Sequence, residues 1–483
     1  MISTNEVKRA MNQCPYWLIA ILFLIVPILP SVAAATVFGS GPPHGFINIE
    51  CLAIGICALF LPRGIILGML IAQMFLDYAY SLCYTYSFTL KELLGSLRYL
   101  ALLPAPRIAA GLMSFLLGLG ICAILAAIRP APDQKWRAAL ALGAAVILAC
   151  TVDVIDGQNF LVKHDSTLIN VRFVRSPLVV LSAWQVSALR REMTVEASAN
   201  KPMTSASDSV MALLDNQKKS GVTPNIVLVV VESWGKIDVK SEDAGFAREL
   251  EAEYHLPRIT SNYEVISAAA PFSGLTVPGE ARELCHSTLG MGMIEASSND
   301  LLACLPNLLR QRGYEALAFH GYLGQMFYRD RWYKKIGFEQ TMFRKELQQA
   351  GLPMCKGAFP GICDASIAGY IKEHYLKADG DTPRFLYWVT LNAHLPVPVH
   401  PDVADDGFCG LFPTLQRSPA LCSWFRIERA AHRAIADMAA SNPGRPTIFV
   451  IVGDHAPPFG SADLRQRFSS TEVPYVILVP KPH

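Results

Sequence analysis

Two apolar stretches of this sequence end in side chains of the kinds that bind metal ions. NIVLVVV, residues 225–231, runs directly into Glu232. TIFVIVG, residues 447–453, runs into Asp454 and His455. Buried parallel strands present ligands at their carboxyl ends, so neighbouring strands would gather two carboxylates and an imidazole at one sheet edge. That set predicts a divalent metal site. Taken singly, each motif is better explained by a solvated loop acid, for Glu232, or a hydrogen-bonded loop histidine, for His455.

A third segment contains a hydroxyl that could act as a nucleophile. PFSGLTVPGEAREL, residues 271–284, is rich in small residues and has Thr276 near its centre. A threonine at a helix N-terminus can attack as an anion if a metal lowers its pKa and the helix dipole favours negative charge. The alternative is a helix cap, with Thr276 as N-cap, Pro278 in the first turn and Glu280 four residues on.

Two further segments place groups that bind phosphate after short apolar runs. FHGYLGQMFYRDRWYKKIGF, residues 319–338, contains His320, Arg329 and Asp330, and NAHLPV contains His394. A guanidinium presents a planar fork to phosphate oxygens, and a histidine can orient or protonate a leaving group. The alternative for the first segment is a solvated charged helix with core aromatics.

The elements that would position these groups alternate along the second half of the chain. Continuous apolar strands separated by helices predict an α/β domain with a mostly parallel sheet covered on both faces. The predicted strands are 225–231, 316–319, 385–391, 447–452 and 475–479, and the predicted helices are 299–312, 364–377 and 423–440.

The first part of the chain is too apolar for an ordinary soluble domain. Of 483 residues, 52% are hydrophobic and only 17% are charged. Stretches of about 20 apolar residues cross a bilayer as helices. Two stretches carry no charge, two contain Glu50 and Asp77 respectively, and one is shorter, which predicts five membrane spans: 16–37, 46–61, 64–84, 108–128 and 138–152.

The basic loops orient these spans. Cytoplasmic loops are enriched in Lys and Arg, so the N-terminus and two short loops are predicted to face the cytoplasm and everything after about residue 156 the outside. If residues 1–35 were instead a signal peptide cleaved near Ala33 to Ala35, the later part would still lie outside. The basic residues concerned are Lys8, Arg9, Arg63, Arg129, Lys135 and Arg137.

These patterns divide the chain into three parts. Residues 1–156 are predicted to be a transmembrane domain, 157–222 a connector and 223–483 an extracytoplasmic catalytic domain. The net charge of +2 says little about partners, and the lack of a basic stripe argues against nucleic acid.

Cysteine usage agrees with an oxidising compartment. Six of the twelve cysteines lie beyond the apolar region, and an even number there suggests three disulfides. The near pairs, 355 with 363 and 409 with 422, are the expected bonds, and free or metal-binding thiols are the alternative. The six residues are Cys285, Cys304, Cys355, Cys363, Cys409 and Cys422.

The order of these motifs resembles the alkaline phosphatase and sulfatase superfamily. The shared order is Glu after the first strand, Thr on a small-residue loop, His-Gly before an aromatic-x-Arg-Asp, then His-x-Pro, then Gly-Asp-His. Five spans before an extracytoplasmic domain resemble, within it, the lipoteichoic acid synthases and the lipid A phosphoethanolamine transferases. The resemblance implies metal ligands at Glu232, Thr276, Asp454 and His455, with Thr276 as nucleophile, and substrate-phosphate residues at His320, Arg329 and His394.

The resemblance also implies a reaction. Such enzymes take a phospho-headgroup from a membrane phospholipid onto the threonine and pass it to an acceptor hydroxyl on an envelope glycan or glycolipid. It implies one divalent ion, zinc or manganese, and a multi-pass protein of the bacterial inner membrane with its catalytic domain outside. GLTVPGE and HGYLGQMFYRD are similar to the phosphoglycerol branch. One position departs from it, because this chain has Phe327 where that branch usually has a tryptophan. The cysteine-rich domain is similar to the phosphoethanolamine branch.

Two other functions remain open. A phosphodiesterase or sulfatase could use the same metal core, although sulfatases of the superfamily need Cys or Ser where Thr276 stands. A non-enzymatic envelope assembly factor would be expected to lack some ligands, and all four are present.

Overall fold

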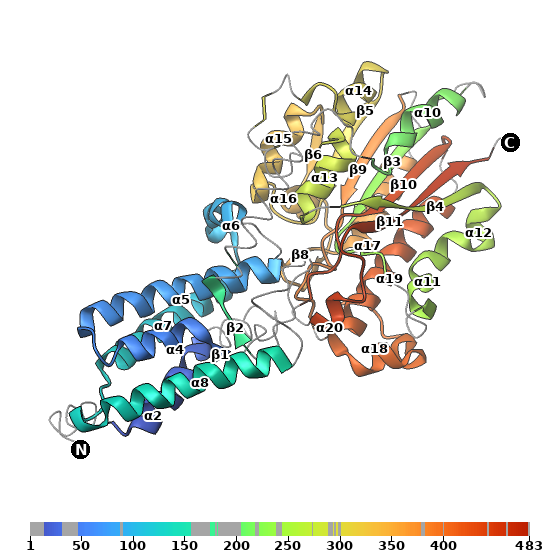
Figure 1. The fold of residues 1–483 in the computed structure, drawn as a ribbon. Helices are drawn as coiled ribbons and strands as arrows, with labels where there is room; N and C mark the ends of the chain where they lie inside the picture. Colours follow the sequence, from blue (N-terminus) through green and yellow to red (C-terminus); the bar gives the residue numbers. More distant parts are fainter. Residues whose placement is uncertain are drawn as a thin grey trace. The chain divides into compact units, whose positions relative to one another are not determined.

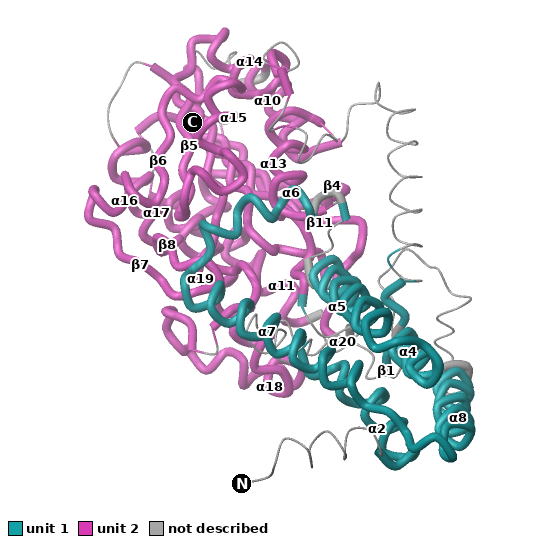
Figure 2. The backbone as a smooth tube through the Cα atoms, turned by 90° about the vertical axis from the view of Figure 1, so that its left-hand side faces the viewer, with its two compact units in different colours: residues 1–194, 459–462 teal, residues 195–458, 463–483 magenta. Residues whose placement is uncertain are grey.

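The structure is a computed structural model. It describes residues 14–30, 47–86, 90–155, 174–178, 181, 204–217, 222–237, 244–272, 274–287, 293, 296–297, 301–377, 382–398, 400–441, 444–459 and 462–481. The chain forms two compact units, residues 1–194 with 459–462 and residues 195–458 with 463–483 (Figure 2). Most of the predicted connector and the cleavage site near Ala33 to Ala35 lie outside the described residues.

The first unit is helical. A helix lies in each of the five segments predicted to span a membrane, and a short helix, α6, follows the third of them. Among the described residues, two helical segments are long and apolar enough to cross a membrane, Arg63–Cys83 and Ala105–Ala127. Five spans therefore remain a prediction. The helices are α2 (Tyr16–Ile25), α4 (Ile49–Cys57), α5 (Arg63–Tyr86), α6 (Leu90–Ser96), α7 (Ala105–Ala127) and α8 (Lys135–Ile155).

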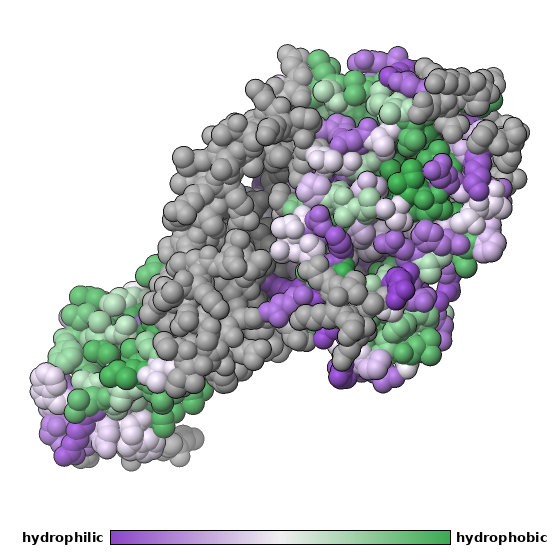
Figure 3. All heavy atoms as spheres, turned by 45° about the vertical axis from the view of Figure 1, so that its right-hand side comes forward, coloured by the Kyte–Doolittle hydropathy of each residue, from purple (hydrophilic) through white to green (hydrophobic). Residues whose placement is uncertain are grey.

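The surface of this unit is unusually apolar. Large hydrophobic side chains on α7 and α8 remain exposed, among them Leu112, Met113, Leu116, Leu140 and Ile147. Hydrophobic residues, drawn in green, cover much of the face of this unit that is visible in Figure 3. An exposed apolar surface of this kind suits contact with lipid rather than with water.

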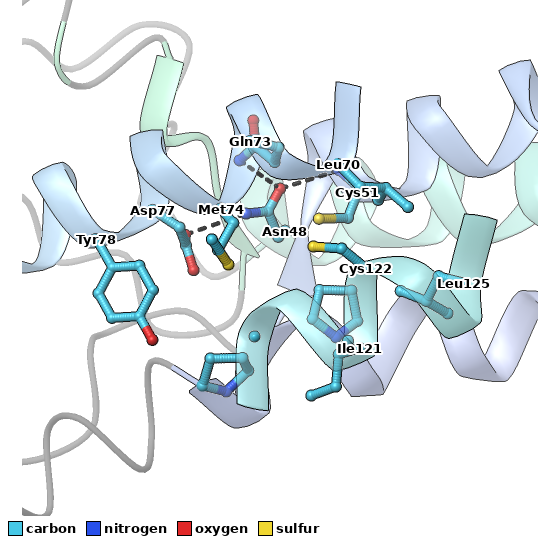
Figure 4. Close-up of a pocket in the computed structure, with 13 residues that line it drawn as sticks. Asn48, Cys51, Leu70, Gln73, Met74, Asp77, Tyr78, Ile121, Cys122 and Leu125 are labelled. Carbon is cyan, nitrogen blue, oxygen red and sulfur yellow. Dashed lines mark hydrogen bonds between the residues drawn. The ribbon is translucent and has the colours of Figure 1, made fainter. Parts of the chain in front are cut away.

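One acid of the predicted membrane segments is buried in a polar cluster. Asp77 on α5 is 5% exposed and accepts a hydrogen bond from Asn48 Nδ2 at 3.2 Å. Gln73 donates in turn to Asn48 Oδ1 at 3.3 Å, beside a cavity of about 30 Å³ (Figure 4). The hydrogen bonds join α5 to the N-cap of α4, so this polar cluster acts as a link between two helices of the unit.

The second unit is built on a seven-stranded sheet of order β4-β11-β10-β3-β9-β5-β6 (Figure 1). The five strands from β10 to β6 are parallel, whereas β11 and β4 are antiparallel to their neighbours. The predicted mostly parallel α/β sheet is therefore confirmed. The strands are β3 (Asn225–Val231), β4 (Tyr263–Pro271), β5 (Glu315–His320), β6 (Gln340–Met342), β9 (Arg384–Val389), β10 (Thr447–Gly453) and β11 (Glu472–Pro480).

Helices cover both faces of this sheet. Alternate residues of β3 point to opposite sides, and all seven are buried, as a central strand requires. One face packs against α10 (Asp208–Gln217), α13 (Thr276–Cys285), α14 (Leu305–Gln311) and α15 (Arg329–Lys335), which share one hydrophobic core with it. Helices α11 (Ala244–Ala252), α17 (Asp364–Ile371) and α19 (Pro419–Ala440) lie on the other side, where α19 contacts both of the others (Figure 1).

Three disulfides staple this unit. They join Cys285 to Cys304, Cys355 to Cys363 and Cys409 to Cys422. The predicted number of bonds and both predicted near pairs are confirmed. The first bond ties the end of α13, the helix that begins at Thr276, to the segment before α14.

Candidate active site

The two acidic strand ends meet at one edge of the sheet. Strands β3 and β10 are parallel neighbours, with Val231 opposite Gly453, so the residues that follow them lie side by side. One ligand atom from each of Glu232, Asp454 and His455 lies within 4.8 Å of the others, and all three side chains are buried. The arrangement that the sequence predicted as a metal site is thus present in the fold.

Helix α13 brings Thr276 to this cluster. Thr276 is the first residue of the helix, its Oγ1 donates to Glu232 Oε2 at 2.9 Å, and it lies 3.5 Å from His455 Nε2. The N-cap position belongs to Leu275, and Thr276 makes no capping hydrogen bond, so the interpretation of Thr276 as a helix cap is wrong. Its hydroxyl faces the acidic cluster at the positive end of the helix dipole.

Neighbouring polar groups fix the orientation of the ligands. Ser233, held at φ 64°, directs its backbone N–H to Asp454 Oδ1 at 2.8 Å and its hydroxyl to Glu232 Oε1 at 2.9 Å. The hydroxyl of Thr390 accepts from the backbone N–H of Glu232 at 2.8 Å. His455 Nδ1 lies 2.9 Å from the carbonyl of Ala456, which leaves Nε2 as the atom directed at the carboxylates.

The electrostatics of the cluster call for a cation. Burial and the charge of Glu232 raise the pKa of Asp454 to about 7. Burial lowers the pKa of His455, but the charges of Asp454 and Glu232 outweigh it and raise the value to about 9. Burial raises the pKa of Glu232, but the charges of His394 and His455 bring it well below its usual range. Two carboxylates so close together need positive charge beside them, and the protonated imidazole of His455 supplies it when no metal ion is bound.

The donor set fits a divalent metal ion. Asp454 Oδ2 is buried and has no hydrogen-bond partner among the described residues, and its neighbour at 3.3 Å is His455 Nε2. A buried acceptor that forms no hydrogen bond is costly unless something else binds it. Carboxylate, hydroxyl and imidazole together are a ligand set that zinc and manganese accept.

Two of the three phosphate-binding candidates on residues 319–338 lie together. Arg329 is 2% exposed, and its Nη1 lies 3.4 Å from His320 Nε2. His320 Nδ1 lies 3.1 Å from the Val389 carbonyl, and burial and the charge of Arg329 lower the pKa of His320 to about 3. His320 is therefore neutral, with Nδ1 as donor. For the third candidate, Asp330, the buried Oδ1 has no hydrogen-bond partner in the described part of the chain.

His394 follows strand β9 on the same edge of the sheet. Its Nδ1 lies 2.7 Å from the carbonyl of Leu395, and its charge lowers the pKa of Glu232. Asp364 holds this loop through backbone N–H groups of Leu391 and Asn392 at 3.1 and 2.7 Å. His394 is thus near the cluster of Glu232, Asp454 and His455, as its place after a strand suggested.

Sequence reasoning missed several residues that shape the site. Glu280 pairs with Arg329, and Arg282 donates to the carbonyls of Gly453 and Asp454 at 2.7 and 3.3 Å. The signal for both was weak, because a charged residue on a short helix is usually solvated. Their burial, at 0% and 1% exposure, is a property of the folded chain alone.

The fold and this site define a class of protein. The sulfatase family profile matches residues 224–482, more than half of the chain. The chain therefore belongs to the sulfatase family, in the alkaline phosphatase and sulfatase superfamily, whose members use a divalent metal. No curated protein matches the sequence.

Several solved structures are similar to the chain. The integral membrane lipooligosaccharide phosphoethanolamine transferase A of Neisseria meningitidis is 13% identical, with 97% of this chain and 89% of that chain covered and a TM-score of 0.43. The lipoteichoic acid synthase LtaP of Listeria monocytogenes is 14% identical, with coverages of 55% and 71% and a TM-score of 0.39. The periplasmic domain of EptC from Escherichia coli, in complex with zinc, is 14% identical, with coverages of 55% and 75% and a TM-score of 0.35.

Proposed function

We propose that the chain is a metal-dependent transferase that moves a phospho-headgroup from a membrane phospholipid to a cell-envelope glycan or glycolipid. The headgroup is phosphoglycerol or phosphoethanolamine. The observation that carries the proposal is the position of Thr276, whose hydroxyl lies at the N-terminus of α13, 2.9 Å from Glu232 Oε2. A buried hydroxyl aimed at an acidic cluster is a nucleophile in position rather than a solvated side chain.

Four side chains would bind the metal ion. Glu232, Thr276, Asp454 and His455 would hold one zinc or manganese ion. When bound, the ion supplies positive charge that lowers the pKa of the Thr276 hydroxyl.

The residues of the chain have separate roles in the transfer. Thr276 Oγ1, which has released its proton to solvent, bonds to phosphorus while the bond from phosphorus to the diacylglycerol oxygen breaks. His394 gives a proton to that oxygen, and diacylglycerol leaves as an alcohol. An acceptor hydroxyl then gives its proton to His394, bonds to phosphorus and displaces Thr276. His320 and Arg329 hold oxygens of the transferring group.

The location of the enzyme follows the same proposal. Residues 1–156 form a five-span domain in the bacterial inner membrane, 157–222 a connector, and 223–483 the catalytic domain outside the cytoplasm. The two long apolar helices and the three disulfides support a membrane protein with an oxidised outer domain. A lipid donor is reached most directly by an enzyme anchored in the same membrane.

The proposal is tested by tandem mass spectrometry of the Thr276 peptide from full-length protein purified out of its native membrane. We expect an adduct on Thr276, absent from Thr276→Ala, whose mass distinguishes phosphoglycerol from phosphoethanolamine. No adduct after incubation with phospholipid and metal, together with release of free headgroup, would instead support a phosphodiesterase.

A further inference from the structure

Arg329 is held by a buried acid on the helix that carries Thr276. Glu280 Oε2 accepts from Arg329 Nε at 3.0 Å and from Nη2 at 2.8 Å. The side chains are 0% and 3% exposed. Two of the three guanidinium nitrogens are therefore bound on one side, and the third, Nη1, lies against His320 at 3.4 Å.

Two tyrosines fix Glu280 from the opposite side. Tyr387 on β9 donates its hydroxyl to Glu280 Oε1 at 3.0 Å, and Tyr333 on α15 donates to the same oxygen. Burial and the charge of Glu280 raise the pKa of both hydroxyls well above the ordinary value, so they remain donors. Oε1 thus accepts from both tyrosines and, at 3.3 Å, from Arg329 Nε, while Oε2 accepts from Nε and Nη2.

Glu280 also fixes a distance along α13. It lies four residues after Thr276, so the two side chains are one helical turn apart on the same face. The helix is rigid over this turn because Gly279 packs closely against Asp454 and Arg282 binds the carbonyl of Gly453. A displacement of Arg329 relative to Thr276 would require Glu280 to move first.

We propose that Glu280 is a positioning residue for the transfer reaction: it holds Arg329 at a fixed place relative to Thr276 and leaves Nη1 for an oxygen of the substrate phosphate. The inference rests on the proposed function, since it assigns Arg329 to the phosphate. The pair is not accounted for by stability alone, because replacing a buried ion pair by apolar residues is often neutral or stabilising. A directional role accounts for a charged pair at this buried position.

A double-mutant cycle tests this role in full-length protein in its native membrane. Glu280→Gln keeps the shape of the side chain and one acceptor oxygen but loses the charge and the second oxygen. Arg329→Lys keeps the positive charge but loses the planar guanidinium that binds the carboxylate through two nitrogens. We expect Glu280→Gln to lower kcat on the order of 100-fold, since misplacement by about 1 Å costs that much, with KM for phospholipid changed less than about threefold. In the Arg329→Lys background the same change should cost less than about threefold.

Milder substitutions test the positioning role in variants that are expected to fold. Tyr387→Phe removes one donor to Glu280, and we expect an intermediate loss of kcat, about three- to tenfold. Tyr314→Phe is its matched control, because Tyr314 donates to the carbonyl of Pro224 at the other end of the sheet and should leave kcat unchanged. Glu373→Gln, an exposed ion-paired acid, controls for loss of charge.

The outcomes distinguish the positioning role of Glu280 from the proposed transferase function. Equal losses from Glu280→Gln in the wild-type and Arg329→Lys backgrounds would overturn the positioning role, as would wild-type kcat in both Glu280→Gln and Tyr387→Phe. No transfer by the wild-type protein would overturn the proposed function itself. Losses by Tyr387→Phe and Tyr314→Phe of equal size would assign the effect to stability and also overturn the inference.

Discussion

The hydroxyl of Thr276 hydrogen-bonds Glu232 Oε2 at 2.9 Å, although the two residues are 44 positions apart. Glu232 ends strand β3, and Thr276 begins helix α13, so the contact joins a strand end to a helix N-terminus. Each element is held by other bonds: Thr390 accepts from the Glu232 backbone, and Arg282 anchors α13 to strand β10. The proposed nucleophile is therefore positioned by the fold before substrate binds.

Removing the Thr276 hydroxyl is predicted to abolish transfer. We expect Thr276→Ala to lower the transfer rate at least about 1000-fold, because no other described hydroxyl occupies its place. Thr276→Ser keeps the nucleophile but loses the methyl group that fixes its rotamer, and should lose about 10- to 100-fold. Headgroup transfer from labelled phospholipid measures both. Activity in the alanine variant above a tenth of wild type would contradict the role.

The strained backbone at Ser233 gives a prediction that separates geometry from hydrogen bonding. Ser233 has φ 64°, a left-handed conformation that costs a side-chain-bearing residue about 1 kcal/mol, and its hydroxyl donates to Glu232. Ser233→Ala and Ser233→Gly both lose that hydroxyl, but only glycine relieves the strain. We expect the glycine variant to unfold with a free energy about 1 kcal/mol higher than the alanine variant.

The two Ser233 variants also give a prediction for metal affinity. Both variants should bind zinc about 10- to 100-fold more weakly than wild type, since outer hydrogen bonds to ligands have effects of that size. Isothermal titration measures the affinity, and denaturant unfolding measures the stability. An alanine variant as stable as the glycine variant would show that the conformation at 233 carries no strain.

The strands of the candidate site, which follow from local sequence patterns, were predicted correctly. Apolar runs ending in Glu232 and Asp454 specify central strands, because such runs are buried on both faces wherever they pack, and parallel pairing then brings their ends together. Strand β4, Tyr263–Pro271, was missed because it is an edge strand whose side chains are partly exposed, so it lacks a continuous apolar run.

Contacts between helices cannot be predicted from local sequence patterns. The pairing of Glu280 with Arg329 depends on how α13 and α15 pack on one face of the sheet, and nothing local marks either residue as buried. The left-handed backbone at Ser233 is likewise imposed by the neighbouring strand end, since serine has no preference for it. The sequence therefore predicts the ligands better than the groups that orient them.

Two helical glycines give opposite predictions. Gly369, on α17, has open space around it, and Gly369→Ala should stabilise the domain by about 1 kcal/mol through helix propensity. A Cβ added at Gly279 would lie 2.8 Å from Asp454 Cβ and 3.0 Å from its Cα. Gly279→Ala should therefore destabilise by about 1 to 3 kcal/mol, because the helix must move away from the metal ligand.

The same pair tests whether α13 contacts the metal ligands closely. We expect zinc affinity to fall about 10- to 100-fold in Gly279→Ala and to be unchanged in Gly369→Ala. Denaturant unfolding and isothermal titration measure the two effects. Stabilisation by both alanines to the same extent would show that the close approach of Gly279 to Asp454 is absent in solution.

A buried histidine behind the site predicts loss of stability in acid. His432 on α19 is 0% exposed, and its Nδ1 lies 2.8 Å from the Tyr254 hydroxyl. Glu428 Oε2 is 3.7 Å from His432 Nε2, but burial raises the pKa of this carboxyl well above its usual range, so it offers little charge. Burial accordingly lowers the pKa of His432 to about 3.

The direction of the pH effect follows from proton binding. Unfolded histidine titrates near pH 6.5, so below that pH the unfolded chain takes up a proton that the folded chain does not. Stability contributed by neutral His432 is thus complete above pH 6.5 and falls toward pH 3 by up to about 1.4 kcal/mol per unit. Between pH 7 and pH 5 we expect a loss of about 2 kcal/mol from this residue.

His432→Gln isolates this contribution because glutamine does not titrate. The free energy of unfolding, followed by tryptophan fluorescence in urea, should depend less on pH in this variant, so its difference from wild type narrows by about 2 kcal/mol from pH 7 to pH 5. Tyr254→Phe keeps the histidine and loses only its partner hydroxyl, so it should be destabilised at both pH values while keeping the wild-type pH dependence. A constant difference between His432→Gln and wild type over this range would mean that His432 takes up its proton in the folded protein, and that the pocket behind the metal ligands admits charge.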